Sequence, residues 1–136
     1  MFIDASAMVA ILTSEPRAGA LVEALDVAEA RITSPLAVFE SVTALSRKLG
    51  QDVATSERQL QRFLDLSGIH IVPITEAVGA EALAAHARYG KGRGHPARLN
   101  LGDCFAYACA RIHGVPLLFV GDDFSRTDIE PAPPAT

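Results

Sequence analysis

Short apolar runs alternate with longer amphipathic segments along this sequence, and the alternation restricts the folds that the chain can adopt. The apolar runs that are short enough for strands cover residues 2–3, 32–33, 69–74 and 116–120. The segments with the apolar spacing of helices cover residues 5–12, 17–28, 35–49, 55–67, 75–89 and 100–113. Strands that alternate with helices are typical of a parallel sheet covered by helices. The sequence therefore predicts an α/β sandwich with a small, mainly parallel sheet.

Residues that favour helix ends support these boundaries. Ser34 precedes Pro35, and a Ser cap followed by Pro in the first turn is a strong helix start. Gly50 is placed to end the same helix. Thr75 and Asn100 are suitable caps for the two long helices that follow.

The length and composition are those of one ordered domain. The chain has 136 residues, of which 49% are hydrophobic but only 6% aromatic, so the core should be mainly aliphatic. We expect the domain to cover residues 1–129 and the segment 130–136, EPAPPAT, to form a disordered tail. A protein that coats nucleic acid is expected to be basic, whereas a nuclease with metal-binding carboxylates need not be, so the formal net charge of −4 does not by itself decide between these classes.

The sequence gives no sign of export or membrane insertion. No basic residues precede the N-terminal apolar run, and no apolar run reaches the ~18 residues of a membrane span. The two cysteines, Cys104 and Cys109, lie five positions apart in a predicted helix, where they point in different directions and cannot easily form a disulfide. We therefore expect a reduced, cytoplasmic location and no membrane partner.

Acidic residues follow two of the predicted strands. Asp4 follows the run at 2–3, and Asp122 and Asp123 follow the run at 116–120. Ligands of open α/β sheets bind outside the carboxyl ends of the strands, so these acids would share one edge if the two strands are parallel neighbours. A purely structural explanation is also open, because Asp is common at helix caps and in turns.

Two further acids lie in predicted helices. Asp103 stands in the first helical turn, where the helix dipole favours a negative charge and would also keep the carboxylate ionised for a cation. Gly102, just before it, leaves room for the close approach of another group. Glu40 lies off the apolar stripe of its helix, which by itself predicts an exposed surface residue. That stripe consists of Val38, Val42, Leu45 and Leu49.

Carboxylates gathered in this way suit a hard divalent cation. Mg²⁺ and Mn²⁺ prefer oxygen ligands, and they can orient a phosphodiester, activate water and stabilise a leaving oxygen. The histidines and cysteines are scattered and do not have the spacing of a competing metal site. Ser6, two residues after Asp4, could cap the first helix or hydrogen-bond a phosphate or a water molecule at such a site.

A basic, glycine-rich segment precedes Asp103. No acid occurs between Glu81 and Asp103, and the three glycines at positions 90, 92 and 94 indicate a flexible loop. Its cationic residues are Arg88, Lys91, Arg93 and Arg98. Such a loop could hold an RNA backbone beside an acidic metal site, or it could simply be solvated and balance charge elsewhere.

The acids fall within a recurring set of motifs. The motifs are MFIDASA at 1–7, PLAVFE at 35–40, NLGDCFAYA at 100–108, and LLFVGDDF at 117–124 followed by TDI at 127–129. In this order they resemble the PIN-domain family, specifically the VapC-type toxins, over nearly the whole chain. The resemblance implies a PIN-like three-layer α/β/α sandwich and Mg²⁺-dependent endonucleolytic cleavage of RNA, with Mn²⁺ as an alternative ion. It also implies a VapB-type antitoxin that blocks the site, and a homodimer.

The resemblance also implies roles for individual residues. The catalytic set would be Asp4, Glu40, Asp103 and Asp122, with Ser6 and Asp123 as additional candidates. Asp4 and Asp103 would bind the metal, and Glu40 would orient or deprotonate the attacking water. Attack would be in line and would leave a 3′-hydroxyl. Family members vary in spacing at this motif, so the choice between Asp122 and Asp123 as the last acid stays open, with Asp122 slightly favoured.

Three other functions remain open. A PIN domain could process RNA without an antitoxin, which an upstream reading frame for a small DNA-binding protein would decide. A phosphoacceptor signalling domain would also bind Mg²⁺ at strand ends, but it needs paired acids after its first strand, where Asp4 stands alone. A catalytically inactive PIN domain used for binding is disfavoured because all the acids are present.

Overall fold

A computed structural model of the chain describes residues 1–132, and in that range short parallel strands alternate with helices. The strands are β1 (Phe2–Ile3), β2 (Ile32–Thr33), β3 (His70–Ile71) and β4 (Leu117–Leu118). The helices are α1 (Ala5–Leu12), α2 (Ala18–Val27), α3 (Pro35–Leu49), α4 (Val53–Ser67), α5 (Glu76–Tyr89), α6 (Leu101–His113) and the 3₁₀ helix η1 (Phe124–Arg126). The alternation predicted from the sequence is therefore confirmed.

The helices form where capping residues predict them. The side chain of Ser34 accepts a hydrogen bond from the Ala37 N–H at 3.1 Å, so it caps α3. Thr75 and Asn100 cap α5 and α6 in the same way. Gly50 ends α3 with φ of 61°, a left-handed conformation in which glycine has no steric penalty.

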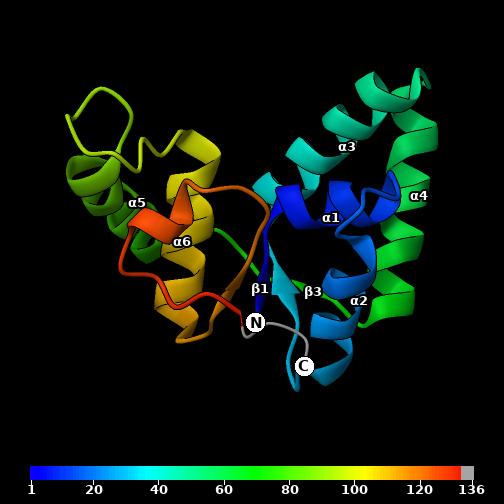
Figure 1. Cartoon of the computed structure of the whole chain (residues 1–136), viewed down its shortest axis with the longest axis horizontal. Helices are drawn as coiled ribbons and strands as arrows, with labels where there is room; N and C mark the ends of the chain where they lie inside the picture. The colour runs from blue at the N-terminus through cyan, green and yellow to red at the C-terminus, as the bar shows by residue number, and fades with distance from the viewer. Residues whose placement is uncertain (133–136) are drawn as a thin grey trace.

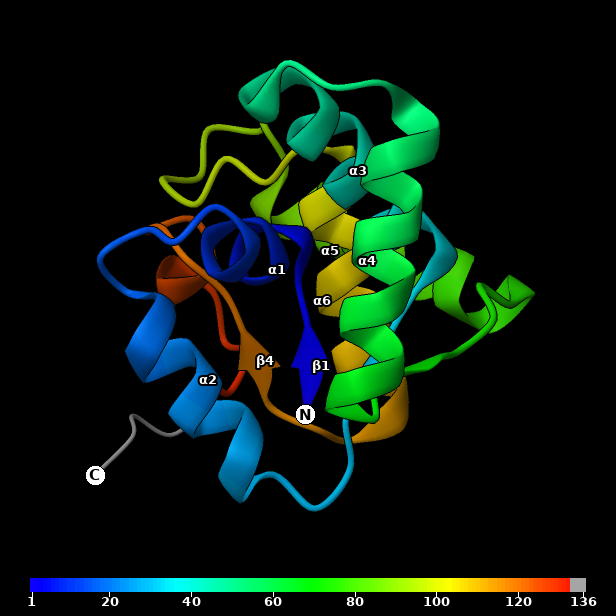
Figure 2. The ribbon, with the colours of Figure 1, turned by 90° about the vertical axis from the view of Figure 1, so that its right-hand side faces the viewer.

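The four strands form one parallel sheet in the order β3-β2-β1-β4. β1 is central, and Phe2 pairs with Ile32 on one side and Leu117 on the other. Figure 2 shows β1 beside β4, with α1 beyond the carboxyl end of β1. The first and last predicted strands are thus parallel neighbours, as the argument about a shared edge requires.

Two strands are shorter than predicted. The run at 69–74 contributes only His70–Ile71, because Pro73 has no N–H to continue the ladder. The run at 116–120 contributes only Leu117–Leu118, and the N–H of Val120 donates instead to the hydroxyl of Ser6 at 3.0 Å. The chain therefore leaves the sheet early on the side where the acids lie.

Helices cover both faces of the sheet and give the three layers of an α/β/α sandwich. Helices α1 to α4 lie on one side, and α5 and α6 lie on the other (Figure 1). Phe2 and Ile3 are fully buried between these layers. The predicted apolar stripe of α3 was wrong at Leu49, which is 45% exposed because residues 47–50 are exposed as a whole. No helix among the described residues is long and apolar enough to span a membrane.

The C-terminal segment returns to the sheet. Pro131 forms an isolated bridge with Leu117, whose N–H donates to the carbonyl of Glu130 at 2.9 Å. The first residues of the tail predicted at 130–136 are therefore hydrogen-bonded to β4. Residues 133–136 of that prediction lie outside the described residues. Cys104 and Cys109 are both buried in α6 and both free, as their spacing predicted.

Candidate active site

Asp4 stands at the carboxyl end of the central strand. It is 6% exposed, and it caps α1 by accepting a hydrogen bond from the Ser6 N–H at 3.0 Å. Burial raises the pKa of Asp4 above its ordinary value, hydrogen bonds from Ser6 lower it, and the charge of Asp123 raises it again. Asp4 is thus a helix cap and a buried carboxylate at once, and the structural and functional explanations do not exclude each other.

Ser6 connects Asp4 to the chain that leaves β4. Its hydroxyl donates to Oδ2 of Asp4 at 2.6 Å and accepts a hydrogen bond from the N–H of Val120 at 3.0 Å. Ser6 does not cap α1, because Asp4 holds that position. Its hydroxyl instead fixes the Asp4 carboxylate and joins the two strand ends that carry the acids.

Asp103 points from the first turn of α6 toward the same edge. It forms a reciprocal capping box with Asn100: the N–H of Asn100 donates to Asp103 Oδ2 at 3.1 Å, and the N–H of Asp103 donates to the Asn100 side chain at 2.9 Å. Burial and the charges of Asp4 and Asp123 raise the pKa of Asp103, the hydrogen bond from the Asn100 N–H lowers it, and the net result is a pKa of about 6. The first turn of α6, where the helix dipole favours a negative charge, is therefore also a position where Asp103 is repelled by Asp4 and Asp123.

Glu40 is half-buried on α3, so the surface position expected from the helix pattern alone was wrong. Its carboxylate lies against Gly102, where an added Cβ would overlap the carboxylate oxygens. The room that Gly102 was predicted to leave is therefore occupied by Glu40. Burial, together with the charges of Asp4 and Asp103, raises the pKa of Glu40 to about 7.

The structure distinguishes the two acids that follow β4. Gly121, with φ of 110°, turns the chain between the end of β4 and these residues. The charge of Asp123 raises the pKa of both Asp4 and Asp103, whereas Asp122 affects neither. Asp123 also precedes η1 without using its side chain as a cap. These electrostatic effects favour Asp123 over Asp122, the reverse of the slight preference from the sequence.

Four segments of the chain therefore bring acids to one edge of the sheet. These acids are Asp4, Glu40, Asp103 and Asp123. Their mutual repulsion and burial would be relieved by a cation, and carboxylate oxygens are the donors that Mg²⁺ prefers. Within residues 1–132 no three His, Cys, Asp or Glu side chains are already arranged to enclose a metal. The set suits the hydrated coordination of Mg²⁺, which commonly uses only one or two carboxylates directly.

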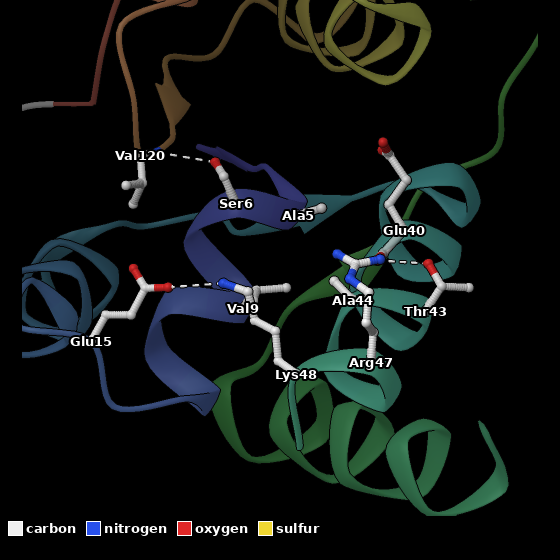
Figure 3. Close-up of a pocket in the computed structure, with 10 residues that line it drawn as sticks. All are labelled: Ala5, Ser6, Val9, Glu15, Glu40, Thr43, Ala44, Arg47, Lys48 and Val120. Atoms are coloured by element: carbon white, nitrogen blue, oxygen red, sulfur yellow. Dashed lines mark hydrogen bonds and ion pairs between the residues drawn. The ribbon is translucent and has the colours of Figure 1, made fainter. Parts of the chain in front are cut away.

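A groove of about 490 Å³ opens beside the acids, between α1 and α3. Ser6 and Val120 lie at one end, joined by their hydrogen bond, and Glu40 projects from α3 on the facing wall (Figure 3). Arg47 and Lys48 line the groove further along α3. These two cations were not singled out in the sequence analysis. The spacing of seven residues between Glu40 and Arg47 nevertheless places Arg47 on the same face of the helix as Glu40.

The predicted basic segment does not line this groove. A pocket beside it is lined by Gly92, Gly94, His95, Pro96 and Arg98 and shares no residue with the groove. Arg88 is engaged by Asp128, with a nitrogen to oxygen distance of 3.4 Å, and its guanidinium lies over the ring of Tyr89. Asp128 also accepts a hydrogen bond from Tyr107, so this part of the last motif anchors α6 and not the acidic edge.

Comparisons with known sequences place this arrangement in a family. The sequence profile of the PIN domain matches residues 1–130. The chain is 42% identical to a VapC ribonuclease of Rhizobium meliloti (strain 1021), over 94% of this chain and 98% of that protein. It is likewise 42% identical to ribonuclease VapC42 of Mycobacterium tuberculosis (strain ATCC 25618 / H37Rv), over 97% of this chain and 98% of the relative.

Solved structures share the fold. VapC20 of Mycobacterium tuberculosis, described as a toxin that cleaves the sarcin-ricin loop, superposes with a TM-score of 0.74 at 18% identity, over 97% of this chain and 98% of that one. A chain of a toxin–antitoxin complex from Klebsiella pneumoniae superposes with a TM-score of 0.66 at 17% identity, over 91% of this chain and 89% of that one. At these identities the likeness establishes the shared α/β/α architecture.

Proposed function

This chain belongs to the PIN-domain family, among its VapC-type ribonucleases, and on that premise we propose that it is a Mg²⁺-dependent endoribonuclease acting as the toxin of a toxin–antitoxin pair. The observation that carries the proposal is the convergence of Asp4, Glu40, Asp103 and Asp123 on one sheet edge. Acids that repel each other at the carboxyl ends of parallel strands are poorly explained by stability alone.

Asp4 and Asp103 would hold the metal, with Mn²⁺ able to replace Mg²⁺. The Ser6 hydroxyl fixes one oxygen of Asp4, and the capping box fixes one oxygen of Asp103, so both carboxylates are held in place before any ion binds. Asp123 would complete the negative charge of the set in preference to Asp122. When bound, the ion supplies positive charge that orients the phosphodiester and makes water more acidic.

Glu40 would accept the proton of the attacking water. A pKa of about 7 suits a general base at neutral pH, because the group is partly ionised there and still binds a proton well. The water oxygen bonds to phosphorus while the bond from phosphorus to the 3′ oxygen breaks in line. Glu40 takes one water proton, solvent protonates the leaving oxygen, and the products are a 5′-phosphate and a 3′-hydroxyl.

The toxin role and the antitoxin partner draw their support from the relatives. The VapC names of the relatives and the toxin–antitoxin complex with the same fold favour a VapB-type antitoxin that covers the acidic edge. We also propose that the chain acts as a homodimer in the cytoplasm. Detection of a stable complex with the product of a neighbouring antitoxin gene, and loss of cleavage within it, would test this part of the proposal.

The test of the catalytic proposal is RNA cleavage by purified protein with Mg²⁺ or with EDTA. The variant Asp4→Asn, Asp103→Asn should fold, because Asn also caps helices, but it should not cleave. A matched control, Asp26→Asn, Asp65→Asn, removes the same charge from exposed positions and should cleave normally. Equal cleavage by both double variants, or cleavage that survives EDTA, would disprove the assigned site.

A further inference from the structure

The groove between α1 and α3 is continuous with the acidic edge and has a cationic far side. Ser6, Val120 and Glu40 line it near the acids, and Arg47 lines it about two helical turns further along α3, ~10.5 Å by the rise of an α-helix. Since Glu40 and Arg47 share a face of one helix, the backbone fixes the separation of their Cα atoms, and the Arg47 side chain extends back along α3 toward Glu40 (Figure 3). A ligand that spans the groove can therefore contact both Glu40 and Arg47.

The two cations of the groove differ in availability. Lys48 is paired with Glu15, with a nitrogen to oxygen distance of 3.2 Å, and this pair joins α3 to the turn that follows α1 (Figure 3). Arg47 makes no side-chain hydrogen bond or ion pair with any residue in the range 1–132 that the structure describes. Its guanidinium is exposed on the groove side of α3 and retains all its donors for a ligand.

The middle of the groove is lined by small apolar residues. Ala5 and Val9 of α1 face Ala44 of α3 across it. Small side chains leave room for a flat or bulky group, and their apolar atoms suit the face of a base or the carbon skeleton of a sugar. The groove thus offers the acidic edge at one end and, on its α3 wall, a guanidinium for a phosphate beside small apolar side chains (Figure 3).

We propose that this groove holds the nucleotide next to the scissile phosphodiester, and that Arg47 binds the phosphate of that nucleotide in single-stranded RNA. This assignment rests on the proposed ribonuclease function and names the residue that positions its substrate. It places the backbone contact on α3, not in the basic loop predicted from the sequence. A guanidinium suits the role because its planar donors match two phosphate oxygens at once.

Binding and salt dependence test the assignment directly. The probe is a labelled, randomised single-stranded RNA of about 12 nucleotides, measured by fluorescence anisotropy with Ca²⁺ replacing Mg²⁺. Arg47→Met should weaken binding about tenfold and should lower the slope of log affinity against log salt by about 0.7, the loss of one phosphate contact. The control Arg62→Met removes an exposed arginine of α4 that lies outside the groove, and it should change neither quantity.

A second pair of variants probes the apolar middle without changing charge. Ala44→Phe fills the groove and should weaken binding with an unchanged salt slope, whereas Ala54→Phe, at an exposed position of α4, should not. In cleavage assays with Mg²⁺ on total RNA, Arg47→Met should raise the RNA concentration for half-maximal rate about tenfold and leave the saturated rate within about twofold. A large fall in the cleavage rate at saturating RNA would instead assign Arg47 to the chemical step and contradict a role in substrate positioning.

The outcomes separate this inference from the function on which it rests. If the unmodified protein cleaves RNA but Arg47→Met binds with the same affinity and salt slope, the groove does not hold the substrate and this inference alone fails. Weaker capture of a purified antitoxin by Arg47→Met, with RNA binding unchanged, would assign the groove to the protein partner instead. If the unmodified protein neither binds nor cleaves RNA, both proposals fail.

Discussion

Replacing Glu40 with Gln should stabilise the metal-free protein at neutral pH. The folded state raises the pKa of Glu40 from 4.5 to about 7, so it holds the proton more tightly than the unfolded chain does between these values. The free energy of unfolding should therefore fall as pH rises through this window and stay low above it. At about 1.36 kcal/mol per pKa unit the full shift corresponds to roughly 3 kcal/mol, and partial exposure of Glu40 reduces this to about 2 kcal/mol.

The measurement is urea unfolding followed by circular dichroism, with EDTA present, from pH 4.5 to pH 8. Glu40→Gln should come within about 0.5 kcal/mol of the unmodified protein at pH 4.5, where Glu40 is neutral in the folded state and half ionised in the unfolded chain, and it should exceed the unmodified protein by about 2 kcal/mol at the alkaline end. Glu57→Gln, at an exposed position of α4, is the control and should run parallel to the unmodified protein. A Glu40→Gln curve that also runs parallel would refute the argument that this carboxylate is held against its own ionisation.

Three further predictions follow from the contacts of the site. Gly102→Ala should change the free energy of unfolding by no more than about 1 kcal/mol, but its methyl group should displace the Glu40 carboxylate. RNA cleavage should therefore fall about 100-fold, and unchanged cleavage would contradict the close packing of Glu40 against Gly102. Ser6→Ala removes hydrogen bonds to Asp4 and Val120 and should cost about 1–3 kcal/mol in thermal or urea unfolding. Asp123→Asn should reduce cleavage at least ~10-fold more than Asp122→Asn, and equal losses would show that the electrostatic distinction between them is irrelevant to catalysis.

The sequence was sufficient for the order of elements and for the edge where the acids meet. Helix caps are local, so Ser34, Thr75 and Asn100 predict helix starts from a few neighbouring residues. The short runs that became β1 and β4 carried enough apolar character to be recognised as strands. Asp4 lies near the acids after β4 because β1 and β4 are parallel neighbours, and the parallel arrangement was predicted from the alternation of strands and helices.

Long-range packing decided what the sequence left open. The helix pattern around Glu40 predicts an exposed residue, and only the approach of α6 with Gly102 turns that position into a half-buried one. The choice between Asp122 and Asp123 depends on a turn at Gly121 whose direction motif spacing does not specify. Arg47 was missed because nothing local distinguishes it from other surface arginines; the groove that makes it notable requires α1 packed beside α3.

The capping role of Asp4 couples the acidic edge to the folding of the chain in sequence order. Asp4 emerges from the ribosome well before Asp123 and can start α1 at once, whereas β4 must still be made and insert beside β1. A growing chain therefore has helices long before it has a complete set of carboxylates. Nascent chains and chains terminated before β4 should consequently be inert toward RNA, and the proposed activity should arise only once β4 and Asp123 have been synthesised.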